Sequence, residues 1–226
     1  MIDTEAASIE LARAVGLSTI HAEVMTFDGV RALVVSRYDR RPTESGGLER
    51  IHQEDSAQAL GLDTTDMNRK FQRGKTLPSL RAIATVLRNG GSEPDQLLQL
   101  TTFNLAVGNS DAHAKNISVL RLADGSAKLA PAYDVAMHAH HEGFGDVFAM
   151  DVNALQTMSE ITGDDLVAEG VSWPLPAVRA RRAVEGTLER LQAALADIDR
   201  ERHPGVSADA WRAVEERTTQ LRSSLP

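Results

Sequence analysis

The chain contains no cysteine among its 226 residues. This absence excludes disulfide bridges, cysteine-ligated zinc and thiol nucleophiles, and it fits a reducing compartment. Aromatic residues make up only 4%, so we expect leucine, valine, isoleucine and alanine to form the core. No stretch approaches the roughly 18 apolar residues of a transmembrane helix, and the acidic residues 1–5 lack the apolar run of a signal peptide. We therefore expect a cytoplasmic protein without a membrane partner.

Positive charge is also scarce, because 24 Lys and Arg residues stand against 32 Asp and Glu residues, a net charge of −8. An acidic chain lacks the basic face that displaces counterions from nucleic acid, so we expect no direct nucleic-acid binding. Hydrophobic residues make up 42% and charged residues 25%, which is ordinary for a soluble globular protein. The length allows one large domain or two small ones.

The first forty residues predict a helix followed by a β-hairpin. The helix is expected over residues 4–15. Two apolar, β-branched runs follow at 20–27 and 30–38, and Asp28-Gly29 joins them. Asp-Gly between two such runs is a strong hairpin signal. We expect this hairpin to belong to a larger antiparallel sheet, with exposed edges that invite pairing with another chain.

The next segment predicts little regular structure. We expect a polar loop at 40–49, a short helix at 53–60, and an irregular, charged stretch at 61–78. Basic clusters of this kind are usually solvated. The basic residues of the stretch are Arg69, Lys70, Arg73 and Lys75.

The rest of the chain is predicted to be mostly helical. Apolar residues recur at helical spacing in four segments. The apolar stripe of the segment at 178–199 is interpreted as part of the core. A short hairpin is expected around Asp124-Gly125, and residues 137–148 show little periodicity. The helices are expected at 80–87, 97–107, 178–199 and 208–221, and the hairpin strands at 117–122 and 127–130.

Three polar residues between these elements carry the chemistry. Asp111 and Asn116 have four residues between them, and Asp134 follows after the short hairpin. Phosphoryl transfer needs one carboxylate that orients and deprotonates a hydroxyl, and hard oxygen ligands that hold Mg²⁺ on the phosphates. The kinase catalytic loop has the same Asp-x-x-x-x-Asn spacing and a metal-binding Asp further on. The pattern therefore favours phosphoryl transfer.

Two other interpretations of these residues remain open. The spacing alone also describes a capped helix end, because Asp, Asn and Ser are favoured turn residues. A metal-dependent hydrolase is the rival enzyme class, since a His-x-His-His run can bind zinc. The residues of that rival site would be His138, His140, His141, Glu142 and Asp146.

Four segments, taken together, resemble the HipA family of bacterial toxin kinases. Residues 108–116 resemble its catalytic-loop signature, and residues 131–135 resemble its metal-binding segment, where Tyr-Asp stands in for Asp-Phe-Gly. Residues 35–40 are similar to the hinge strand that reads adenine. Residues 53–61 are similar to the opening of the helical lobe. The segments keep the family's order and cover almost the whole chain.

The resemblance implies a role for each matching residue. Asp111 is the expected catalytic base, and Lys115 is expected near the transferring phosphoryl group. Asn116 and Asp134 are expected to bind Mg²⁺. Tyr38, Asp39, Gln53 and His113 are expected around ATP, with Tyr38 at the adenine, Asp39 at the ribose, and Gln53 and His113 near the nucleotide or its phosphates.

The resemblance also implies the fold and the partners. We expect an α+β, mostly helical protein, with residues 1–40 as a remnant of the kinase N-lobe and residues 41–226 as the helical C-lobe. Family members phosphorylate a Ser or Thr on a protein, in known cases an aminoacyl-tRNA synthetase. They are often encoded beside a HipB-like DNA-binding antitoxin.

The sequence departs from the family pattern before its first helix. The phosphate loop and the strand Lys that grips ATP are missing, although Glu5 matches the acidic partner of that Lys. Loss of one such contact is expected to cost on the order of 3 kcal/mol of transition-state stabilisation. The alternatives are therefore a truncated or mis-started reading frame, a fragment of a longer chain, a kinase completed by a separate N-terminal lobe protein, or a degenerate, inactive pseudokinase that acts as a binding module.

Overall fold

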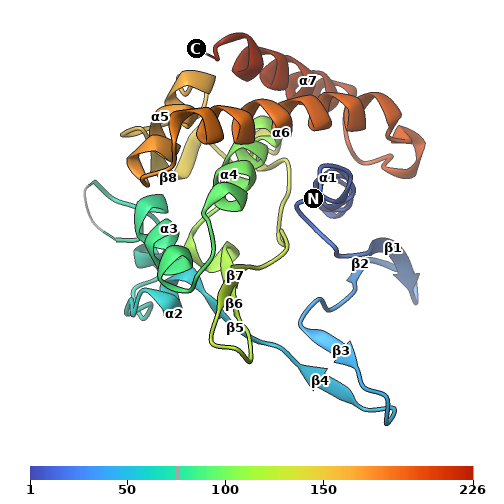
Figure 1. Ribbon diagram of the computed structural model, residues 1–226. Coiled ribbons are helices and arrows are strands. Elements are labelled where there is room, and N and C mark those ends of the chain that lie inside the picture. The colour runs from blue at the N-terminus through green and yellow to red at the C-terminus, as the bar shows by residue number, and fades with distance from the viewer. Residues whose placement is uncertain (75–76, 226) are drawn as a thin grey trace.

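The computed structural model describes residues 1–74 and 77–225. The chain is a mixed α+β protein with 45% helix and several small sheets. The helices α4 to α7 lie in the upper part of Figure 1, and the strands β1 to β7 lie below them, with α2 and α3 beside β5 to β7 and β8 next to α5. The class α+β is confirmed.

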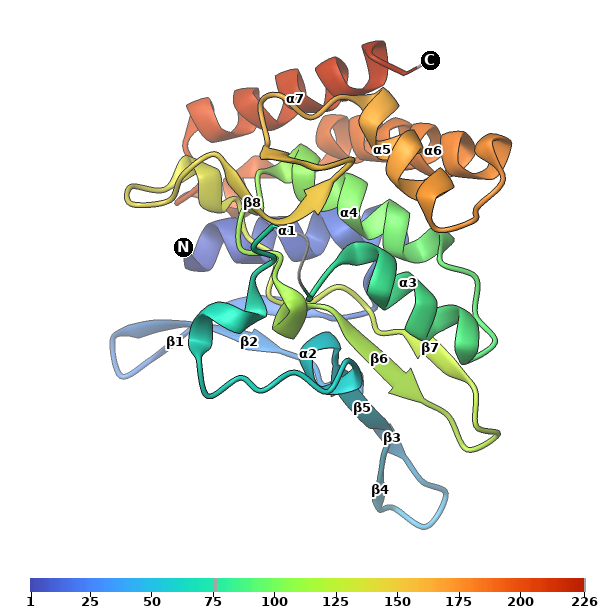
Figure 2. The same cartoon turned by 90° about the vertical axis from the view of Figure 1, so that its left-hand side faces the viewer.

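The long helix α6 (Ala177–Asp197) organises the helical part. It packs against α1 (Ile2–Ala14), α4 (Asp95–Val107), α5 (Gly163–Ser172) and α7 (Ala208–Ser223). α6 and α7 run side by side in both views (Figures 1 and 2). The stripe predicted in this region is core. The fully buried side chains of this part include Phe103, Leu98, Trp173, Leu188 and Val214.

The N-terminal hairpin forms as predicted. β1 (Ala22–Phe27) pairs with β2 (Val30–Val35), and the turn residues Asp28 and Gly29 both have positive φ, at 48° and 81°. Two residues with positive φ match the right-handed twist of the strands. No other strand in the part of the chain described pairs with this hairpin. Its exposed apolar side chains are Met25, Phe27, Val30, Val34 and Val35.

The expected polar loop at 40–49 is wrong in part, because it holds a second hairpin, β3 (Arg40–Pro42) with β4 (Leu48–Arg50). This hairpin projects from the body of the molecule (Figures 1 and 2). Local polarity hid it, since its side chains are largely exposed and carry no buried apolar face.

The helix expected at 53–60 starts three residues late. β5 (His52–Asp55) pairs with β6 (Ser118–Arg121), which also pairs with β7 (Ala127–Leu129). The helix α2 (Ser56–Ala59) then begins at a capping box. Pairing with a strand more than sixty residues away decides the first part of this segment. The hairpin predicted around residues 124–125 is confirmed as β6 and β7.

The segment between α2 and α4 agrees with the sequence in outline. A short 3-10 helix, η1 (Met67–Lys70), interrupts the irregular stretch, and α3 (Leu80–Asn89) follows. The side chains of Lys70 and Arg73 lie over the Phe71 ring, at 5.0 and 5.1 Å from its centroid. Lys75, the last member of the basic cluster, lies outside the residues described.

Three elements after Asp134 were not predicted, namely the strands β8 (Val147–Val152) and β9 (Leu155–Thr157) and the helix α5. The turn between the strands, Asn153-Ala154, has positive φ at both residues without a glycine. The usual hairpin signal is therefore absent from the sequence. Two further 3-10 helices are η3 (His138–His140) and η4 (Arg200–Arg202). Across the residues covered by the structure, no helix has the length and apolar character to cross a membrane.

Candidate active site

The loop that carries Asp111 begins where α4 ends. Gly108 closes this helix in the left-handed conformation, with φ 75°. The backbone N–H of Asn109 donates to the carbonyl of Asn104 at 2.8 Å, and the carbonyl of Gly108 accepts from Ala139 at 2.8 Å. A buried helix and a distant segment thus both fix the start of the loop.

The loop closes on itself through hydrogen bonds around Asp111. The side-chain Nδ2 of Asn116 donates to the Asp111 carbonyl at 3.0 Å, and the His113 backbone N–H donates to the same carbonyl at 2.8 Å. The last three residues of this loop form the short 3-10 helix η2 (Ala114–Asn116). The Asp111 carboxylate remains 35% exposed. It is therefore fixed through the backbone while its side chain stays open to a ligand.

His113 lies beside this carboxylate inside the protein. Its Nε2 is 3.8 Å from Asp111 Oδ2, and its ring meets the edge of the Phe71 ring at 5.3 Å between centroids. Burial lowers the pKa of His113, while the charges of Asp111 and Asp134 oppose this change. We expect a neutral His113 at neutral pH.

Tyr133 joins the Asp134 segment to the loop. Its hydroxyl donates to the Lys115 carbonyl at 2.8 Å and lies 2.6 Å from Ser118 Oγ. Asp134 follows with an exposed side chain and φ 51°, a left-handed conformation uncommon outside glycine. The sequence placed Tyr133 in the motif but gave it no role. Its hydrogen bonds show that it holds Asp134 against the loop.

Tyr38 and Gln53, two of the residues expected around ATP, also meet here. The Tyr38 hydroxyl donates to Gln53 Oε1, and the Tyr38 ring stacks on the Tyr133 ring with centroids 6.0 Å apart. Burial raises the pKa of Tyr38 to about 12, so the hydroxyl stays protonated. The structure thus brings the turn after β2, the strand β5 and the Asp134 segment together.

The Asp39 carboxylate, by contrast, is not accessible to a ligand. The side chain is 1% exposed and is paired with Arg37 at 2.6 Å and Arg40 at 2.5 Å. Hydrogen bonding to Arg37 is the main reason that the pKa of Asp39 falls to about 2. The carboxylate expected at the ribose is therefore occupied by two guanidinium groups in this structure.

The histidine-rich segment does not converge on a metal. His138 is hydrogen bonded to Asn109, His141 lies 2.7 Å from the Thr4 hydroxyl, and the Asp146 carboxylate accepts from Ser159. Within the ranges that the structure describes, no group of three or more His, Cys, Asp or Glu residues could hold a metal ion. The arrangement gives the hydrolase alternative no support.

The residues expected to bind Mg²⁺ have a suitable donor set. The amide nitrogen of Asn116 is engaged by the Asp111 carbonyl, so its amide oxygen is left as the free atom. Asp134 presents an exposed carboxylate. Both are hard oxygen ligands of the kind that Mg²⁺ prefers. Lys115 is exposed on the same loop.

Glu5 brings α1 to this region. Burial is the main cause of its raised pKa, and the charge of Asp134 adds to it. Among the residues that the structure describes, no Lys or Arg forms an ion pair with Glu5, although the charge of the N-terminal ammonium group acts to lower its pKa. Glu5 is therefore a half-buried carboxyl without a Lys or Arg partner in the described part of the chain.

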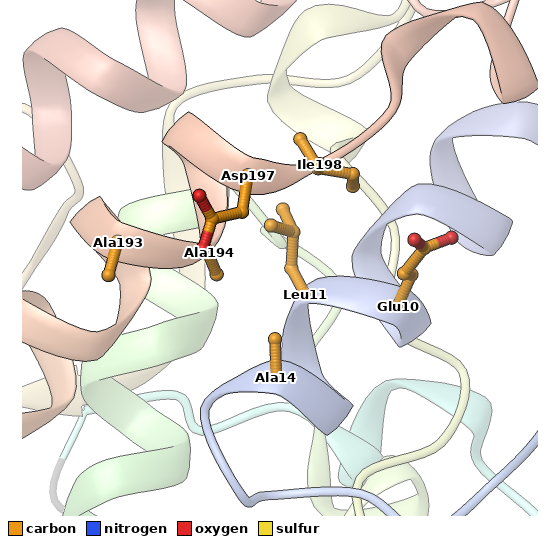
Figure 3. A pocket seen from close by; sticks show the side chains of 7 residues that line it. All are labelled: Glu10, Leu11, Ala14, Ala193, Ala194, Asp197 and Ile198. Carbon is orange, nitrogen blue, oxygen red and sulfur yellow. The ribbon is translucent and has the colours of Figure 1, made fainter.

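A cavity of about 250 Å³ lies between α1 and the end of α6, and none of the candidate site residues lines its described wall. Figure 3 shows Leu11 and Ala14 of α1 facing Ala194 and Ile198, with the Asp197 carboxylate above them. Nothing in its lining resembles a reaction centre. The residues expected to carry the chemistry lie instead around Asp111.

The fold and the site together define a protein of the kinase-like class. The structure matches HipA of Shewanella oneidensis, solved in a complex with HipB and operator DNA, with a TM-score of 0.79 and 25% identity over 99% of this chain and 55% of that one. It also matches the proinflammatory kinase CtkA of Helicobacter pylori in fold, with a TM-score of 0.57 and 11% identity over 98% of this chain and 82% of that one.

More particularly, the chain belongs to the HipA-like C-terminal domain family, and the sequence model of this family matches residues 1–197. It is 34% identical to Y4mE of Sinorhizobium fredii over 86% of this chain and 47% of that protein. It is 31% identical to the serine/threonine-protein kinase toxin HipA of Shewanella oneidensis over 68% of this chain and 38% of that protein. The chain thus spans less than half the length of these relatives.

Proposed function

We propose that this chain is the catalytic part of a HipA-like serine/threonine protein kinase that transfers phosphate from ATP with Mg²⁺. The observation that carries the proposal is the single cluster formed by Asp111, Asn116 and Asp134. Asn116 is tied to Asp111 by a 3.0 Å hydrogen bond, and Tyr133 holds the Asp134 segment to the same loop. Family membership supports the same reaction.

In this proposal each residue has one task. Asp111 orients the acceptor hydroxyl and takes its proton, while that oxygen bonds to the γ-phosphorus and the bond to ADP breaks. Asn116 and Asp134 hold Mg²⁺, which offsets charge on the phosphates. Lys115 adds positive charge beside the transferring group. His113, kept neutral by its surroundings, donates or accepts a hydrogen bond there.

We further propose a nucleotide pocket beside Tyr38 and Gln53. Stacking of Tyr38 on Tyr133 and its hydrogen bond to Gln53 support a flat, partly apolar wall for adenine. A ribose contact by Asp39 requires that Arg37 or Arg40 release the carboxylate. Residues 1–40 then belong to an N-lobe, and residues 41–226 form the C-lobe.

The proposed toxin role and partners are those of the family. A protein Ser or Thr is the acceptor, with an aminoacyl-tRNA synthetase as the first candidate. Likeness to a HipA that was solved with HipB and operator DNA supports a HipB-like antitoxin as partner. The relatives are more than twice as long as the matched part, and the unpaired β1–β2 hairpin supports a need for further N-terminal strands.

The decisive test compares Asp111→Asn with Asp124→Asn, an exposed turn residue at the tip of the β6–β7 hairpin. Phosphate transfer from labelled ATP is measured for the chain alone and with the N-terminal part of a relative added. We expect Asp111→Asn to lose about a hundredfold or more in rate, and Asp124→Asn to keep it. Equal rates for both variants would refute the assignment of the base.

One observation favours a second candidate, a pseudokinase that acts as a binding module. Glu5 forms no ion pair with a Lys or Arg among the residues described, although full kinase activity needs a Lys–Glu pair near ATP. Calorimetry with Mg-ATP separates the two. Binding that is weakened by Asp134→Asn supports the kinase, whereas no binding, even with the N-terminal part added, supports the module.

A further inference from the structure

A pocket of about 220 Å³ lies beside the loop that carries Asp111. It shares His113, Lys115 and Asn116 with the proposed site, whereas Tyr38, Gln53 and Asp134 do not line the described part of its wall. Its lining residues are Thr64, Met67, Lys70, His113, Lys115 and Asn116. It is formed by η1 on one side and the loop after Asp111 on the other.

The charge of this pocket has one sign. Lys70 and Lys115 line it, and no carboxylate lies in its described wall. Neither lysine forms an ion pair with a residue in the described parts of the chain. In a protein of net charge −8, two cations at one hollow form a local positive field that attracts an anion.

The position of Lys70 is fixed by a stack of side chains. Its Nζ lies 5.0 Å from the Phe71 ring centroid, and the Phe71 ring meets the His113 ring at 5.3 Å. The stack therefore holds η1 against the catalytic loop. Lys70 is half-buried, so its ammonium group is held at the pocket more firmly than that of an exposed lysine.

The pocket also lies beside the proposed base. His113 lines it, and His113 Nε2 is only 3.8 Å from Asp111 Oδ2. A peptide in extended form advances roughly 3.3 Å per residue. When a substrate hydroxyl reaches Asp111, this spacing allows a side chain one or two residues away to reach the pocket that Lys70 and Lys115 line.

We propose that this pocket is a specificity subsite that binds an acidic side chain of the protein substrate next to the accepting Ser or Thr, with Lys70 as the residue that reads its charge. The inference rests on the proposed kinase function. The ligand chemistry is a carboxylate. A phosphate of ATP has similar chemistry and is the competing source of an anion at this site.

Binding of labelled peptides to the full chain tests the proposal without relying on catalysis. Three peptides share one Ser and differ only in flanking Glu, Gln or Lys residues, and fluorescence anisotropy gives their affinities at low salt. We expect the Glu peptide to bind about fivefold more tightly than the Gln peptide, the scale of one partly exposed charge pair. Lys70→Gln should remove this preference, and Lys70→Glu should reverse it toward the Lys peptide.

Lys128→Gln, an exposed lysine on β7, is the matched control and should keep the preference. An unchanged preference in Lys70→Glu, or no binding of any peptide by the unmodified chain, would overturn the subsite. A loss of Mg-ATP affinity in Lys70→Gln that equals its loss of peptide affinity would also overturn it, because the anion would then be the nucleotide.

These experiments distinguish a failure of the subsite proposal from a failure of the kinase proposal. Charge-dependent peptide binding without phosphate transfer, even with the N-terminal part added, would keep the subsite and reject the kinase. Phosphate transfer that is indifferent to flanking charge and to Lys70 would keep the kinase and reject the subsite.

Discussion

His138 Nδ1 lies 2.7 Å from Asn109 Oδ1, and this hydrogen bond is buried. An amide oxygen only accepts, so His138 donates from Nδ1. Asn109 in turn donates from Nδ2 to Asn104 Oδ1 at 3.0 Å. The chain of bonds joins the segment after Asp134 to the end of α4. It therefore fixes the start of the catalytic loop, two residues before Asp111.

Loss of this histidine is expected to destabilise the protein. His138→Ala removes the donor and leaves the buried Asn109 oxygen unpaired, which should lower the free energy of unfolding by about 2 kcal/mol. Urea denaturation measures the change. His21→Ala, at an exposed residue, is the control and should change stability by less than about 0.5 kcal/mol. Equal effects would mean that the bond contributes nothing.

A side chain at Gly108, at the end of α4, is expected to lower the stability of the protein. The φ of 75° at this position costs an alanine about 1 kcal/mol, and an added Cβ would lie 3.0 Å from His140 Nε2 and 3.3 Å from Ala139 Cβ. We expect Gly108→Ala to cost about 2 kcal/mol in all. Gly125→Ala has a similar φ of 83° but open space, and should cost about 1 kcal/mol. Thermal unfolding compares the two, and equal losses would show that the neighbours move aside.

Asp39 should make stability depend on acid pH. Its pKa in the folded protein is about 2, against 3.8 when unperturbed. A carboxyl with a lowered pKa stabilises the fold above its unfolded pKa, and this contribution disappears as the pH falls from about 4 through 2. It is worth at most about 2 kcal/mol, since Arg37 is 60% exposed. Asp39→Asn should therefore be less stable than the unmodified chain at neutral pH, with a gap that closes in acid. Urea unfolding at several pH values measures it, and a constant gap would contradict the ion pairs.

Glu5 should have the opposite effect on the pH dependence of stability. Burial and the charge of Asp134 raise its pKa, so the folded state disfavours the ionised form as the pH rises. We expect Glu5→Gln to stabilise the chain at neutral pH by about 0.5 kcal/mol, a value discounted for solvent screening. The gain should vanish below about pH 4, where both states are protonated. A loss of stability at neutral pH would instead reveal a cation partner for Glu5.

Part of the fold follows from local signals alone. Asp28-Gly29 between two β-branched runs predicts β1 and β2, and helical spacing predicts α3, α4, α6 and α7. By contrast, β5 was predicted as helix because its partner β6 is distant in sequence. The hairpin of β8 and β9 was missed because Asn153-Ala154 lacks the glycine that marks most tight turns.

The candidate site, like the fold, could be predicted only in part from local sequence. The sequence alone determined the residue types that are proposed to carry the chemistry, since a carboxylate, an amide and a second carboxylate at this spacing suit Mg²⁺-dependent phosphoryl transfer. Only the tertiary structure decided which of them are available. It closes Asp39 with two arginines, holds Asp134 to the loop through Tyr133, and brings Lys70 to the side of His113. The reason is physical: spacing fixes chemical type, whereas burial, ion pairing and contact between distant segments depend on how the chain packs.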